Sequence, residues 1–161
     1  MNQHGINPIP ECPLYSEFVT DFSALEHMSL PSSHTVLLLV ADASGVRTDV
    51  IARVADRLLA AGLIWVCVWG PDCERVHDIF DEVYAGDGSA QPAFTLMGTW
   101  HDDEPLEEAI WFFIECAFPL GTEIETTSYL AITIGDADWA ATVQHALSDP
   151  TALKARMEAS R

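Results

Sequence analysis

Residues 63–75, LIWVCVWGPDCER, join an apolar run to a charged segment through a Gly-Pro pair. The apolar part, residues 63–69, is rich in aliphatic and aromatic side chains and predicts a buried β-strand. Proline is well tolerated in the first turn of a helix, because its missing N–H would have no partner there. The stretch therefore predicts a strand that leads directly into a helix. Open α/β folds bind their ligands at turns of this kind.

The rest of the chain repeats the same order. We expect strands at residues 35–40, 63–69, 93–99 and 128–134, each followed by a helix with one apolar face. Alternating strands and helices predict a parallel sheet with right-handed crossovers. The predicted fold is an α/β three-layer sandwich with a four-stranded parallel sheet. We expect the flavodoxin-like strand order 2-1-3-4, with the Rossmann-like order 3-2-1-4 as the alternative.

Local signals support the helices and set the limits of the domain. Asp49 and Arg53 are spaced to pair on the first helix, and Asp136 is placed to cap the last one. Residues 35–149 form the predicted single α/β domain. Residues 1–34, rich in Pro and Ser, predict an N-terminal arm with one short helix, and residues 150–161 predict a weakly helical C-terminal tail that frays.

Composition predicts a folded cytoplasmic protein. The 161 residues are 49% hydrophobic, which suits one domain with a full core. No apolar run approaches the roughly 20 residues of a membrane span, and the N-terminus does not resemble a secretory signal. The four cysteines form no CxxC pair, which favours reduced thiols.

The formal net charge of −18 is unevenly distributed. Between Val76 and Leu153 there are fifteen Asp or Glu residues and no Lys or Arg. Such a surface repels nucleic acid and anionic membranes, and it favours cations or a basic protein partner. Solubility of a rather hydrophobic protein is the simpler explanation of the same charge.

Polar and aromatic residues gather where the predicted strands end, at Asp42 and Ser44 and in residues 69–73, 100–104 and 136–139. Because the carboxyl ends of parallel strands meet at one edge of the sheet, we expect these residues to line a common ligand site. The predicted ligand-binding residues are Asp42, Trp69, Asp72, Cys73, Trp100, His101 and Asp102.

Two kinds of chemistry are open at this edge. Cys73 in a first helical turn and His77 four residues later could form a thiol–imidazole pair, with His101 as a third catalytic candidate. Cys73 also falls on the apolar stripe of its helix, where it would be simple packing. A divalent metal could alternatively be held by five residues, although their spacing fits no standard zinc signature: Cys73, His77, His101, Asp102 and Glu104.

No cofactor can be assigned from the sequence. The segment ADASGVRTD after the first predicted strand has neither GxGxxG nor a Walker lysine, so no nucleotide-binding motif is present there. The absence of a GxSxG elbow leaves α/β-hydrolase chemistry unsupported.

The third predicted helix is apolar on every side. Trp111, Ile114 and Phe118 should point away from the sheet, and leaving them in water would forgo about 1.5–3 kcal/mol of burial for each. Either a homodimer forms through these three residues, or the N-terminal arm covers them with its aromatic residues, Tyr15, Phe18 and Phe22.

Two blocks, CVWGPDC and MGTWHDDEPLEEAIWFF, resemble a family of small bacterial proteins known only as a domain of unknown function. The resemblance covers roughly residues 63–118 and implies a bacterial single-domain protein without an assigned activity. It adds weight to the residues of the two blocks, namely Trp69, Asp72, Cys73, Trp100, His101 and Asp102.

Three functional classes remain open. The first is a non-catalytic module that binds a small molecule or a protein at the carboxyl edge of the sheet. The second is a thiol- or metal-assisted enzyme that uses Cys73, His77 and His101. The third is an immunity or antitoxin-like protein whose acidic surface neutralises a basic partner.

Overall fold

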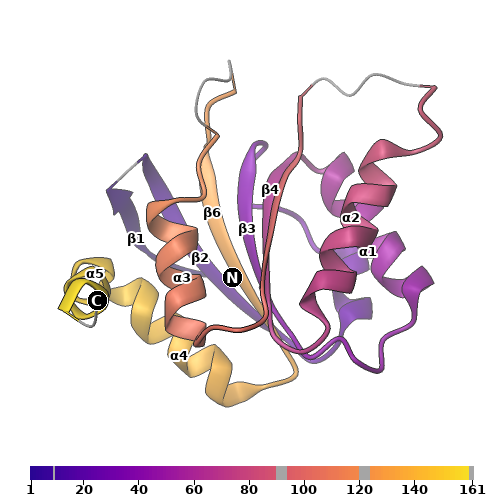
Figure 1. The fold of residues 1–161 in the computed structure, drawn as a ribbon. Helices are drawn as coiled ribbons and strands as arrows, with labels where there is room; N and C mark the ends of the chain where they lie inside the picture. Colours follow the sequence, from indigo (N-terminus) through magenta and orange to yellow (C-terminus); the bar gives the residue numbers. More distant parts are fainter. Residues whose placement is uncertain (9, 90–93, 120–123, 160–161) are drawn as a thin grey trace.

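A six-stranded sheet forms the centre of the molecule (Figure 1). The computed structural model describes residues 1–8, 10–89, 94–119 and 124–159. The strands lie in the order β1-β2-β6-β3-β4-β5. Their bounds are β1 Asn2–Pro8, β2 Glu11–Val19, β3 Thr35–Val40, β4 Leu63–Trp69, β5 Met97–His101 and β6 Ser128–Ile134. β1 pairs antiparallel with β2, and every other neighbouring pair is parallel.

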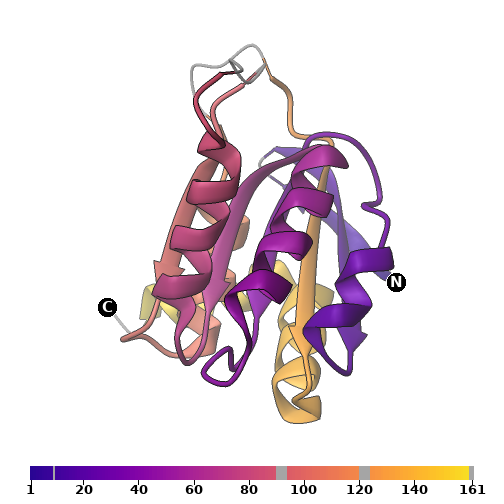
Figure 2. The ribbon, with the colours of Figure 1, turned by 90° about the vertical axis from the view of Figure 1, so that its right-hand side faces the viewer.

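Helices cover both faces of the sheet and make it a three-layer structure (Figures 1 and 2). One face carries the 3₁₀-helix η1 (Phe22–His27) with α1 (Thr48–Ala60) and α2 (Cys73–Ala85). The other face carries α3 (Leu106–Glu115), α4 (Ala137–Ser148) and α5 (Pro150–Ala159). All six residues of β3 are buried, because alternate side chains enter the two apolar layers. In the part of the chain that the structure describes, no helix is long and apolar enough to cross a membrane.

The predicted α/β class is confirmed, and the predicted number and order of strands need correction. The sheet has six strands rather than four. The four predicted strands occupy the order β5-β4-β3-β6, which is the Rossmann-like 3-2-1-4 alternative, and the flavodoxin-like order is wrong. A right-handed crossover determines the face on which its helix lies. α1 and α2 share one face because the chain moves outward from β3 to β5, and α3 lies on the other because the chain then returns past β3.

The strand expected at residues 93–99 starts later and ends later. It spans Met97–His101, and residue 93 lies outside the described residues. The strands at 35–40, 63–69 and 128–134 have the predicted bounds.

The N-terminal segment is part of the sheet and not an arm lying on it. β2 pairs with β6 along Leu14–Val19 against Tyr129–Ile134, and β1 adds an antiparallel edge strand. Cys12, Leu14 and Ser16 are buried, with partly exposed residues between them, so β2 has the period of a half-buried strand. The short helix that was expected in this segment is η1.

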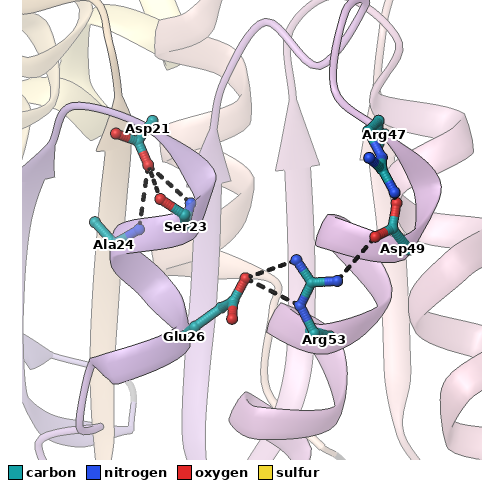
Figure 3. Close-up of polar contacts among 7 residues, drawn as sticks. All are labelled: Asp21, Ser23, Ala24, Glu26, Arg47, Asp49 and Arg53. Carbon is teal, nitrogen blue, oxygen red and sulfur yellow. Dashed lines mark hydrogen bonds and ion pairs between the residues drawn. The ribbon is translucent and has the colours of Figure 1, made fainter.

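Polar contacts hold η1 next to α1 (Figure 3). Asp21 caps η1 by accepting the amide protons of Ser23 and Ala24. Arg53 of α1 forms ion pairs with Glu26, at 3.1 Å, and with Asp49, at 2.9 Å. The pairing of Asp49 with Arg53 is the one that their spacing predicts.

The C-terminal tail is an ordered helix that covers α3. Leu153 and Met157 of α5 are buried in the apolar layer of α3, and Lys154 pairs with Glu115 at 2.5 Å. Ile114 is only 1% exposed, so much of the apolar outer side of α3 is covered within the monomer. The N-terminal aromatic residues do not provide this cover, because Phe22 and Tyr15 pack on the opposite face of the sheet and Phe18 is exposed. Dimerisation through α3 stays a prediction.

A substitution at Gly70 tests the turn between β4 and α2. Its φ is +114°, and a Cβ atom there would lie 2.3 Å from the carbonyl oxygen of Ala41. Backbone strain and the clash together should make Gly70→Ala lower the free energy of unfolding by about 3–5 kcal/mol in urea melts. Gly88→Ala is the control, since Gly88 has φ +75° and open space around it, and it should cost about 1 kcal/mol. Equal losses in the two variants would contradict this account.

A second pair of variants tests whether α5 is docked. Leu153→Ala should lower the free energy of unfolding by about 2–3 kcal/mol, because it leaves a cavity over α3. Lys154→Ala removes a partly exposed ion pair on the same helix and should cost less than about 1 kcal/mol. Calorimetry of both variants checks the ranking. A fraying α5 would leave Leu153→Ala as stable as the unmodified chain.

Candidate functional site

The carboxyl edge of the sheet opens between β3 and β6. The loop after β3 leads to α1 on one face, and the loop after β6 leads to α4 on the other. Open α/β sheets bind ligands in the crevice formed where successive connections part in this way. A pocket of about 530 Å³ occupies this position, and we call it the switch-point pocket. Its lining residues are Thr20, Asp21, Phe22, Asp42, Val46, Pro71, Ile134, Gly135, Asp136 and Trp139.

Three carboxylates from three neighbouring parallel strands surround the switch-point pocket. Asp21 follows β2, Asp42 follows β3 and Asp136 follows β6. Each holds its own loop: Asp42 accepts the amide proton of Ser44 at 3.0 Å, and Asp136 accepts those of Asp138 and Trp139 at 2.9 Å. The predicted cap at Asp136 is therefore confirmed.

Two of these carboxylates are held in the ionised form. Hydrogen bonds from the Ser44 side chain and amide lower the pKa of Asp42 below its ordinary value. The Ser23 hydroxyl, followed by Thr20 and by backbone amides, lowers the pKa of Asp21 in the same direction. Because a lowered carboxyl pKa favours the anion, both groups keep their charge at neutral pH and lose it only below their usual range.

The other walls of the switch-point pocket are apolar and aromatic. Phe22 is buried, and Val46, Ile134, Pro71 and Trp139 complete the apolar lining.

Contacts behind the pocket wall set the position of Trp139. Its ring meets that of Trp69 at 5.1 Å with an interplanar angle of 87°, and the Trp69 indole N–H donates to the Glu104 carbonyl at 2.9 Å. The predicted site residue Trp69 therefore supports the pocket from behind.

The WGPDC turn shapes the loop that carries Asp42. The Ala41 amide donates to the Trp69 carbonyl at 3.1 Å, and the Ala43 amide donates to the Pro71 carbonyl at 3.0 Å. Arg75 donates to the carbonyls of Ala43, at 2.7 Å, and Val46, at 3.1 Å.

Asp72 lies in the same turn and orients Arg75. It adopts a left-handed backbone with φ of 66° and pairs with Arg75 at 2.6 Å. Asp72, expected to bind a ligand, thus orients Arg75, and Arg75 holds the loop of Asp42.

The structure places Cys73 and His77 in the layer between the sheet and α2. Cys73 is 1% exposed, and burial raises the pKa of its thiol, which is the opposite of the predicted activation at a helix N-terminus. His77 lies against Gly98 and meets the half-exposed ring of Trp100 at 4.9 Å. The packing interpretation of Cys73 is the one that its surroundings support.

His101 lies on the other face of the sheet. β4 and β5 are neighbours with Trp69 paired to His101, so the expected proximity of their carboxyl ends is correct. Successive side chains of a strand point to opposite faces, so Trp100 lies with His77 while His101 contacts Phe112 of α3. Cys73, His77 and His101 therefore do not form one catalytic site.

The proposed metal ligands are divided in the same way. Asp102 is exposed, and Glu104 pairs with His101 at 2.5 Å. Among the described residues, no group of three or more His, Cys, Asp or Glu side chains is arranged to hold a metal ion.

Thr99, His101 and Glu104 form a polar chain that the sequence did not indicate. His101 Nε2 lies 3.0 Å from the Thr99 hydroxyl, and Nδ1 lies 2.5 Å from the Glu104 carboxylate. The order hydroxyl, imidazole and carboxylate is that of an acyl-transfer triad. However, His101 is only 8% exposed, and none of the three lines the switch-point pocket. The contacts among these three residues connect β5 to the start of α3. They also hold the Glu104 carbonyl, which accepts the indole N–H of Trp69.

Of the predicted ligand-binding residues, only Asp42 lines the pocket. Asp21 and Phe22 were missed because residues 1–34 were interpreted as an arm. The alternation of Cys12, Leu14 and Ser16 predicts a strand at residues 11–19. Such a strand places Asp21 at the same edge of the sheet. Trp139 belongs to the segment 136–139 that was expected at this edge, and it lies in the first turn of the helix that follows a buried strand.

These features define an α/β domain with a ligand-sized pocket at its switch point. Residues 17–150 match the family described as "Domain of unknown function (DUF7684)". The chain belongs to this family, in agreement with the predicted resemblance to an uncharacterised domain family. The matched segment includes every residue of the switch-point pocket. No curated protein and no solved structure matches the chain.

Thiol alkylation tests the environment of Cys73. Because the thiolate is the nucleophile and its pKa is raised, the rate at Cys73 with iodoacetamide should still rise with pH above 9.0. The half-exposed Cys116 is the internal comparison, and it should react faster at every pH. Peptide mapping by mass spectrometry separates the two sites. A rate at Cys73 that levels off below about pH 8 would restore the reactive-thiolate hypothesis.

Proposed function

We propose that this chain is a non-catalytic binding module that holds a small ligand in the switch-point pocket. The observation that carries the proposal is the pocket itself, which is built from the ends of three neighbouring parallel strands. Its volume of about 530 Å³ falls in the range of small-molecule sites, about 300–1,000 Å³. Its mixture of apolar walls and a few convergent polar groups is also typical of such sites.

The lining residues favour binding over catalysis. All ten are described by the structure, and they include no His, Cys or Lys that could act as a base or nucleophile. A general acid or base works best when its pKa lies near the working pH, whereas the pKa values of Asp21 and Asp42 are lowered further from neutrality. The thiol- and metal-assisted alternatives have no support from the separated positions of Cys73, His77 and His101.

The contacts that hold the lining residues in place are also consistent with a stable binding site. Arg75 holds the loop of Asp42 through two carbonyl groups, and Trp69 supports Trp139. Side chains that are held in place before a ligand arrives reduce the entropy lost on binding. We infer that the residues of the WGPDC block affect ligand binding indirectly, because they hold the lining residues in position.

Blocking the pocket tests the proposal. Val46→Trp replaces a half-buried lining residue by a side chain that fills part of the pocket. A library of small fragments of mixed charge is screened by NMR, with amide shifts of the unmodified chain used to locate each binder. Fragment binding should shift amides of the lining residues and should be lost in Val46→Trp.

Ala60→Trp is the matched control. Ala60 is exposed at the end of α1 and does not line the pocket, so this variant should bind fragments as the unmodified chain does. Shifts that map elsewhere, or binding that persists in Val46→Trp, would show that the switch-point pocket is not the ligand site.

A further inference from the structure

We infer that the switch-point pocket takes a small organic cation, an ammonium or guanidinium group carried on an apolar or aromatic body. This inference rests on the proposed function and adds the chemical class of the ligand. It follows from the charge of the lining residues, from the use of the helix ends beside the pocket, and from its aromatic walls.

The negative charge of the lining residues disfavours anionic ligands. Every charged residue of the lining is an aspartate, and no Lys, Arg or His is among the ten. The whole chain carries a formal net charge of −18, so its long-range field also repels anions from the opening and attracts cations. A phosphate or carboxylate ligand would enter this pocket without a cationic partner.

Two helix starts beside the pocket, those of α4 and η1, are already capped by aspartates. Phosphate binding at a switch point uses free amide groups at a helix N-terminus. Here Asp136 accepts the amide protons of Asp138 and Trp139 at the start of α4. Asp21 does the same for Ser23 and Ala24 at the start of η1. At these two helix starts the protein's own carboxylates take the amide protons that a phosphate would use, and they add negative charge to the pocket. The starts of α1 and α2 have no side-chain cap, but each first turn carries an acidic residue, Asp49 in α1 and Glu74 in α2.

The same carboxylates can receive a cationic group. An ionised carboxylate has two oxygens and about four acceptor positions, so one or two backbone hydrogen bonds leave acceptor capacity. Asp42 is the most suitable partner, because it is exposed, lines the pocket and accepts a hydrogen bond from Ser44 of its own loop. Hydrogen bonds between a charged donor and a carboxylate are the strong ones in proteins.

An organic cation fits the walls better than a metal ion does. The described residues show no group of three or more metal-ligating side chains here or elsewhere. Instead, Phe22 and Trp139 line the pocket with Val46, Pro71 and Ile134. Aromatic faces attract ammonium and guanidinium groups, and apolar walls bury the carbon body that carries them.

Isothermal titration calorimetry with three matched probes tests the charge preference. Tyramine is a cation, 4-ethylphenol is its neutral counterpart, and 3-(4-hydroxyphenyl)propionate is an anion of similar shape. Tyramine should bind more tightly than 4-ethylphenol by about tenfold, and the anion should not bind. Raising the salt concentration should weaken tyramine binding, because the attraction between charges is screened.

Two aspartate variants locate the charge. Asp42→Asn keeps the side-chain oxygen that accepts the Ser44 amide but removes the charge, and it should weaken tyramine binding about tenfold. Asp87→Asn is the matched control, since Asp87 is also exposed and accepts the amide of Ser89 in a turn of the same kind. It changes the net charge equally and should leave tyramine binding unchanged.

The outcomes separate this inference from the proposed function. Equal binding of 4-ethylphenol and tyramine, no binding of tyramine, or equal effects of the two aspartate variants would overturn the cation inference. Fragment shifts at the pocket residues that disappear in Val46→Trp would still support the pocket as the ligand site. Tyramine binding that persists in Val46→Trp would place the cation elsewhere and contradict the cation inference alone, whereas fragment binding that persists in this variant would contradict both.

Discussion

The close contact between Gly70 and the Ala41 carbonyl is the constraint on which the rest of the site depends. Only a residue without a Cβ atom can bring the end of β4 so near to the end of β3. This approach allows backbone hydrogen bonds to pass from Ala41 to Trp69 and from Ala43 to Pro71. Arg75 then reaches the carbonyls of the same loop, and Asp42 is held at the mouth of the pocket.

The pocket also depends on a strand that lies far from this turn in the sequence. β2 pairs with β6 and brings Thr20, Asp21 and Phe22 to the carboxyl edge, where they form one wall. β6 brings Asp136 and Trp139 to the opposite side. A parallel sheet places all of these strand ends on one edge, so residues from the beginning, middle and end of the chain meet around one cavity.

The aspartates that cap η1 and α4 stabilise these helices and also give the pocket negative charge. Asp21 and Asp136 satisfy amide groups that would otherwise need a partner, and this use favours the start of η1 and α4. The same side chains place negative charge at two helix starts beside the pocket. Ordinary helix caps therefore contribute to the negative charge of the pocket.

Local sequence patterns were enough to predict the α/β class, the bounds of β3, β4 and β6, and the place of Asp42 at a strand end. These features depend on local patterns, such as the continuous apolar run TVLLLV and the break at Gly70 and Pro71. The strand order, the pairing of β1 and β2 with the rest of the sheet, and the docking of α5 over α3 became clear only from the folded chain. The alternation in β2 indicates a strand, but its neighbour in the sheet depends on long-range pairing, which no local pattern specifies. The separation of His77 from His101 has the same origin, because the face on which each side chain lies is defined only once β5 has paired with β4.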